Sequence, residues 1–97
     1  TRRAKKDPPA QGGWHIFVTT TGGVGSSNPV LHTWIGAACD KGLFGWPCDA
    51  KIEELRNAYA FAQTDADRKK IATELQTRAI EQVVYVPFGQ WTVPLAY

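Results

Sequence analysis

Two amphipathic stripes with almost no residues between them dominate the second half of the chain. Asp49 is a favoured helix N-cap, and Thr64 is a second one, followed by acidic residues in the first turn. The apolar residues recur at three- and four-residue spacings: Ile52, Leu55, Tyr59 and Ala62, then Ile71, Leu75, Ala79 and Val83. This spacing predicts helices over residues 49–63 and 64–83. Because so few residues separate them, the helices should pack as an antiparallel hairpin.

Two further segments have the composition of β-strands. Residues 14–20 are dense in β-branched and aromatic side chains and nearly continuous in apolar character, which is typical of a strand covered on both faces. A second extended run covers residues 84–93, and its Pro87 should lie at the start of a strand, at a bulge or on an edge. We therefore expect an α/β fold, with α+β as the alternative, in which the helical hairpin packs on a small mixed sheet.

Between these segments lies a loop of small polar residues that ends in Asn28 and Pro29. In open α/β sheets, ligands usually bind at the carboxyl ends of strands, where this loop would lie. Asn28 can cap a helix and Pro29 fits its first position, so residues 30–36 are expected to form one or two helical turns.

The first 13 residues form a basic leading segment rich in Pro and Gly, which predicts a turn or linker. Four basic residues and one acidic residue within residues 1–7 give a net charge of +3, while seven basic and eight acidic residues in 8–97 give −1. Nucleic-acid binders spread Lys and Arg over a face or along a helix. This terminal cluster therefore indicates a solvated segment, and we expect no nucleic-acid partner.

Cys39 and Cys48 flank a loop that contains two glycines and a proline. Such a loop can bring the two sulfurs together, and a bond between them would indicate an oxidising compartment. The alternative is two unrelated buried thiols, because Cys is a common core residue. A metal site is disfavoured, since the spacing is not Cys-x-x-Cys and neither histidine stands in a zinc-finger register with the pair.

The sequence offers little catalytic chemistry. It has only two Ser residues, both in the glycine-rich loop, and no Gly-x-Ser-x-Gly motif. Gly22-Gly23-Val24-Gly25 lacks the Lys-Ser/Thr ending of a phosphate-binding loop. The helical carboxylates alternate with Lys and Arg as on a solvated face; they include Glu53, Glu54, Glu74 and Glu81. We expect neither enzymatic activity nor a cofactor.

Ninety-seven residues provide one hydrophobic core and no more, so residues 1–97 should form a single domain or part of one. No apolar run approaches the ~18 residues of a membrane span, and no apolar segment follows the basic start as in a secretory signal. The sequence contains no Met, which suggests a processed or excised piece of a longer protein.

An ordered set of short motifs resembles the C-terminal part of family 5 solute-binding proteins, the extracytoplasmic receptors of ABC importers for peptides, nickel and related solutes. The motifs are Gly12-Gly13-Trp14-His15-Ile16-Phe17, Asn28-Pro29, Gly45-Trp46-Pro47, Ile52-Glu53-Glu54-Leu55-Arg56-Asn57-Ala58, Thr64-Asp65-Ala66-Asp67-Arg68-Lys69-Lys70 and Val86-Pro87-Phe88-Gly89-Gln90. Together they cover nearly the whole chain.

The resemblance implies part of the second lobe of a two-lobed receptor that closes on a small solute and delivers it to ABC permease subunits. It implies a periplasmic or other extracytoplasmic location, with contact to the membrane through the importer. The segment that faces the cleft in such receptors corresponds to Thr19, Thr20, Thr21, Gly22 and Gly23. Peptide-binding members often carry an acidic residue just before the Pro, where this chain has Asn28. Without this charge, the resemblance favours a solute other than a plain di- or oligopeptide, or a charged anchor elsewhere in the receptor.

The alternative to a receptor is a small secreted interaction module, stapled by Cys39 and Cys48, that binds a protein partner through its Trp-rich surface. For the isolated chain we also expect self-association, because uncovered apolar segments rarely remain in water.

Overall fold

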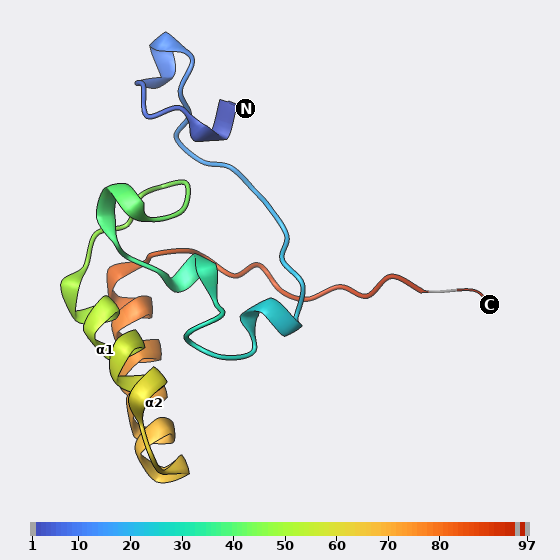
Figure 1. Cartoon of the computed structure of the whole chain (residues 1–97). Coiled ribbons are helices and arrows are strands. Elements are labelled where there is room, and N and C mark those ends of the chain that lie inside the picture. Colours follow the sequence, from blue (N-terminus) through green and yellow to red (C-terminus); the bar gives the residue numbers. More distant parts are fainter. Residues whose placement is uncertain (1, 95, 97) are drawn as a thin grey trace.

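A computed structural model describes residues 2–94 and 96. Its two α-helices are α1 (Ala50–Phe61) and α2 (Asp65–Gln82). Five short 3₁₀ turns precede them, at Arg2–Ala4, Pro9–Gln11, Val24–Ser26, Thr33–Ile35 and Cys39–Lys41. Figure 1 shows α1 and α2 side by side, with the rest of the chain looping beyond one end of the pair. None of the described helices is long and apolar enough to span a bilayer.

The helical hairpin is confirmed, and its ends lie where the capping residues predict. The Asp49 side chain accepts a hydrogen bond from the backbone N–H of Ile52, and the Thr64 hydroxyl accepts one from Asp67. α2 ends at Gln82, and its C-cap residue Val83 adopts the left-handed conformation with φ of 49°. The caps satisfy backbone groups that a helix end leaves without partners, so the helix boundaries follow from local chemistry.

The core lies between the two helices and the loop that precedes them. Ala37 from that loop packs with Ile52, Leu55 and Leu75, and half-buried Ile35, Ile71 and Val84 surround them. Ala79 is also buried, as its place in the apolar stripe predicts. The last member of that stripe, Val83, is exposed because the chain leaves the helix there.

The expected sheet is absent, so the α/β prediction is wrong. Among the described residues there is no strand, only an isolated antiparallel bridge between Ala38 and Cys48. Residues 14–21 and 85–94 are extended, and no backbone hydrogen bond joins either segment to another part of the described chain. Ile16 and Phe88 are more than 80% exposed. A strand needs a neighbouring segment that pairs with its backbone, and no described segment pairs with either of these two.

The one or two helical turns expected over residues 30–36 form as isolated turns and not as a continuous helix. Asn28 Oδ1 accepts hydrogen bonds from the backbone N–H groups of Val30 and Leu31, each at 3.0 Å. This is the hydrogen-bond pattern of a helix N-cap, and His32 N–H also donates to Asn28 O at 3.0 Å, but no longer helix follows this single turn. A single 3₁₀ turn follows at Thr33–Ile35.

Candidate functional site

The predicted disulfide between Cys39 and Cys48 is present, and neither cysteine is free. The bridged loop is closed by backbone hydrogen bonds as well: Cys39 N–H donates to Pro47 O, and Asp49 N–H donates to Ala37 O, both at 3.0 Å. The second bond joins the loop directly to the N-cap of α1. The disulfide therefore fixes the geometry of the loop at the start of the helical hairpin.

An aromatic cluster joins the first extended segment to this loop. Trp14 meets the edge of Phe17 at a centroid distance of 4.7 Å and stacks on Trp46 at 6.3 Å. Phe17 also contacts Trp34 and Phe44, with centroids 6.0 and 6.3 Å apart. Sequence reasoning missed this cluster because its members are dispersed along the chain and follow no periodicity. The four Trp residues in a chain of 97 were the available signal.

The basic leading segment packs on the same aromatic residues. The Arg3 guanidinium lies over the Phe44 ring at 5.1 Å, and the Lys6 ammonium lies over the Trp46 ring at 4.9 Å. Lys6 also forms an ion pair with Asp40, and the Trp14 indole N–H donates to Arg3 O at 3.1 Å. The Lys6 hydrogen bond and charge lower the pKa of Asp40. Residues 2–13 are therefore attached to the disulfide loop and do not form a free linker.

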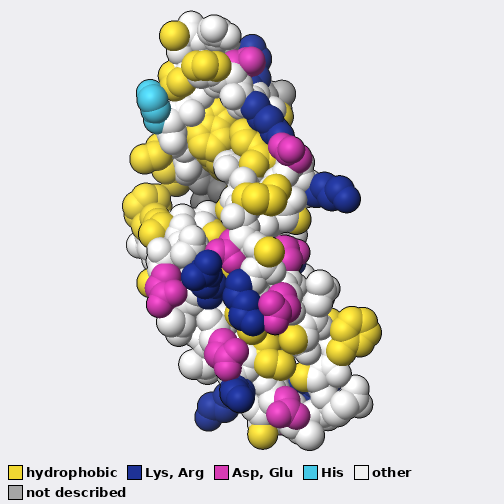
Figure 2. All heavy atoms as spheres, turned by 90° about the vertical axis from the view of Figure 1, so that its left-hand side faces the viewer, with side chains coloured by type: hydrophobic (Ala, Val, Ile, Leu, Met, Phe, Trp, Pro, Cys, Tyr) yellow, Lys and Arg dark blue, Asp and Glu magenta, His cyan; other side chains and the backbone are white. Residues whose placement is uncertain are grey.

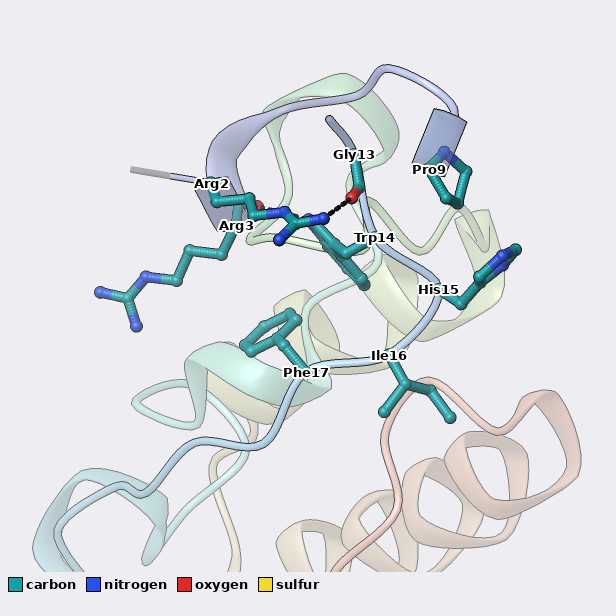
Figure 3. A pocket seen from close by; sticks show the side chains of 8 residues that line it. All are labelled: Arg2, Arg3, Pro9, Gly13, Trp14, His15, Ile16 and Phe17. Atoms are coloured by element: carbon teal, nitrogen blue, oxygen red, sulfur yellow. Dashed lines mark hydrogen bonds between the residues drawn. The ribbon is translucent and has the colours of Figure 1, made fainter. Parts of the chain in front are cut away.

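A hollow of about 630 Å³ lies where the leading segment meets the aromatic cluster. Its lining residues are Arg2, Arg3, Pro9, Gly13, Trp14, His15, Ile16 and Phe17. Figure 3 shows the Arg2 side chain running beside Trp14 to the Gly13 carbonyl, while Arg3 extends away from Pro9 and His15. Gly13 is required here, because a Cβ atom at this position would overlap the Asp7 carbonyl group.

A polar clamp attaches the end of the glycine-rich loop to α1. Arg56 donates to Pro29 O and Val30 O, both at 3.1 Å, and to the Glu53 carboxylate at 3.0 Å. Glu53 in turn accepts a hydrogen bond from Ala37 N–H at 2.7 Å. The expectation that Glu53 lies on a solvated face is therefore wrong. The three-residue spacing between Glu53 and Arg56 is typical of an exposed ion pair on a helix. The hydrogen bond from Ala37 to Glu53 depends on how the preceding loop folds over α1, which the spacing does not show.

His32 and Tyr85 connect the loop to the final extended segment. His32 Nε2 lies 3.2 Å from the Tyr85 hydroxyl, and the two rings are tilted with centroids 5.3 Å apart. Partial burial lowers the pKa of His32, which favours the neutral ring. Within the described residues, no three His, Cys, Asp or Glu side chains gather as metal ligands would.

Thr19, Thr20, Thr21, Gly22 and Gly23 are all exposed. They run in sequence along the end of the first extended segment into the 3₁₀ turn Val24–Ser26. The Ser26 hydroxyl lies within hydrogen-bond distance of Gly22 O and Gly23 O, which tightens this turn. These five residues do not line the hollow beside Trp14. Their assignment to a ligand site stays a prediction.

Comparison with known proteins supports the resemblance stated above. Along all 97 residues the chain is 34% identical to a protein of Sinorhizobium fredii described as a probable peptide ABC transporter periplasmic-binding protein. The chain spans 18% of the length of that relative. No family model matches the chain, and no solved structure matches it. The chain is thus homologous over its whole length to a segment of a periplasmic-binding protein of the peptide ABC transporter type.

Proposed function

We propose that this chain is part of the solute-binding component of an ABC importer, which captures a peptide-like or related small solute outside the cytoplasmic membrane and delivers it to the permease. The observation that carries the proposal is the 34% identity over the whole chain to a periplasmic-binding protein. Such a receptor acts by differential affinity between open and closed forms.

Two features of the chain support this proposal. The Cys39–Cys48 disulfide suits an oxidising compartment such as the periplasm. Thr19, Thr20 and Thr21 place three hydroxyl groups on consecutive exposed residues, next to the backbone of Gly22 and Gly23. Hydroxyl and backbone groups are typical of the polar contacts that orient a small solute. In this proposal the five residues form one wall of the solute site, and the opposite wall comes from a longer chain.

The alternative, a secreted interaction module, has weaker support. Its binding surface would be the Trp-rich face, but Trp14, Trp34 and Trp46 are half-buried against their aromatic neighbours and the leading segment. Trp91 is the exposed exception. An interface needs aromatic anchors that are available to the partner.

The test uses the full product of the gene that encodes this sequence, with thermal shift and calorimetry against di- and tripeptides, amino acids and sugars. A member of one of these classes should raise the melting temperature in a concentration-dependent way. Thr20→Val should weaken binding of that solute, while Thr77→Val, an exposed threonine of α2, should leave it unchanged. If no solute binds, the proposed function fails. If binding is unaffected by Thr20→Val and by the matching changes at Thr19 and Thr21, the assigned wall is wrong.

A further inference from the structure

The hollow beside Trp14 combines two guanidinium groups with aromatic walls. No Asp or Glu is among its lining residues, so within the described part of the chain its lining charges are positive. Arg2 and Arg3 reach it from the leading segment, and Trp14, Ile16 and Phe17 reach it from the start of the first extended segment. A cavity with a cationic rim and an apolar wall is suited to an organic anion.

The two arginines are held in different ways. Arg2 donates from Nε to Gly12 O and from Nη2 to Gly13 O, both at 3.3 Å, so these carbonyl groups fix its guanidinium. The Arg3 side chain makes no hydrogen bond or ion pair in the described structure, and its guanidinium lies over the Phe44 ring. Contact with a ring face leaves the N–H donors available at the edge of the guanidinium. Arg3 is therefore the principal donor for an incoming anion.

The aromatic wall is held in place before any ligand arrives. The Trp14 indole N–H is used by Arg3 O, and its ring is fixed between Phe17 and Trp46. Figure 3 shows the Trp14 and Phe17 side chains next to each other. The Arg3 side chain extends outward on the side of the view where Phe17 lies. A wall that needs no reordering lowers the entropic cost of binding.

We infer that this hollow binds a carboxylate that carries an aromatic ring, with the carboxylate on Arg3 and the ring against Trp14 and Phe17. The site does not include Thr19–Gly23, and the inference does not rest on the proposed function. The carboxylate can belong to a free aryl acid or to the C-terminal end of a peptide, because both present the same groups. The hollow is open, so the expected dissociation constant is about millimolar.

The test titrates the ¹⁵N-labelled 97-residue chain with N-acetyl-L-phenylalanine and follows the Trp14 indole resonance by NMR. A saturable shift is expected. The neutral amide, N-acetyl-L-phenylalaninamide, and acetate, which lacks the ring, should each bind about tenfold more weakly or worse. Titration with 3-phenylpropanoate separates the two sources: tighter binding of the free acid favours an aryl acid, and tighter binding of the acylated amino acid favours a peptide end.

Three variants show whether Arg3 makes the contact. Arg3→Gln should weaken binding about tenfold, whereas Arg3→Lys, which keeps the charge, should lose less. Arg68→Gln, which removes a cation from the start of α2, should change nothing. Circular dichroism checks that each variant keeps its helices. In the wild type, a tenfold rise in ionic strength should also weaken binding, which tests the charge without a substitution.

The inference is overturned if no saturable shift occurs, if the amide or acetate binds as well as the acid, or if Arg3→Gln binds like the wild type. The proposed solute-binding function would survive each of these results, because it rests on the identity to a periplasmic-binding protein and on Thr19–Gly23, and not on this hollow.

Discussion

The helical hairpin and the two extended segments contain similar apolar residues, but these residues are buried in the hairpin and exposed in the extended segments. Ile52 and Leu75 in the hairpin are fully buried, whereas Ile16 and Phe88 in the extended segments are almost fully exposed. The helices satisfy their backbone groups within themselves and need only one neighbour to bury a stripe. An extended segment depends on other chain segments for both its hydrogen bonds and its cover. Among the described residues, helices therefore form where strands that need a pairing partner do not.

The disulfide loop and the leading segment are intermediate between the buried hairpin and the exposed extended segments. It has no regular structure beyond short 3₁₀ turns, but a covalent bond, cation–aromatic contacts and backbone hydrogen bonds hold it. Figure 2 shows one face of the molecule, on which hydrophobic side chains gather in the upper part with Lys, Arg and acidic side chains along one side, while both charge signs mix over the lower part.

The largest effect is expected from Leu75→Ala, because this side chain is 1% exposed at the centre of the hairpin. Its truncation should lower the free energy of unfolding by about 2 to 5 kcal/mol. Chemical denaturation followed by circular dichroism measures the change. The matched control is Ile80→Ala on the same helix, where the side chain is 67% exposed and the loss should be much smaller. Equal losses would show that the buried stripe has been misassigned.

Removing the disulfide should have the next largest effect. Replacing Cys39 and Cys48 together by Ser opens a short covalent ring, and the chain-entropy account gives a loss of about 2.5 to 3 kcal/mol. The same denaturation experiment measures it. Mass spectrometry of protein purified without reductant should find no free thiol, and two free thiols would refute the disulfide.

Acid should weaken the junction between the loop and the hairpin. Hydrogen bonds from Arg78 and from the Ile52 N–H lower the pKa of Asp49, whose side chain is 8% exposed. A carboxyl group whose pKa is lower in the folded state stabilises the fold above its unfolded value of about 3.9 and loses that contribution as the pH falls through the folded value. The unfolding free energies of the wild type and Asp49→Asn should therefore converge as the pH drops below about 4. A constant difference across this range would exclude Asp49 as the titrating group.

The smallest effect on stability is expected from Phe88→Ser in the final extended segment. The side chain is 82% exposed, so the free energy of unfolding should change by no more than about 0.5 kcal/mol. The same substitution should reduce self-association, because uncovered apolar side chains drive it. Sedimentation equilibrium of the wild type and of the Phe88→Ser variant measures the self-association of each. A constant mass near 10.7 kDa for the wild type at all concentrations would contradict self-association.

The elements that the sequence predicts well are those whose signals are local. Asp49 and Thr64 cap helices through residues three positions away, and Leu75 and Ala79 are buried because of their spacing. The sheet was predicted from the composition of residues 14–20 and 84–93, but composition does not supply a pairing partner. The Glu53–Arg56 clamp was missed for a related reason, since the backbone groups that it binds come from residues 29, 30 and 37.

Hydrogen exchange measured by NMR across the whole chain tests most directly the contrast between the hairpin and the extended segments. Amides in the interiors of α1 and α2 should exchange slowly, with the greatest protection near Ile52 and Leu75, whereas amides of residues 14–21 and 85–94 should exchange at nearly the rate of an unfolded chain. Protection of the extended segments equal to that of the helices would contradict the account, because it would mean that their backbone groups are paired.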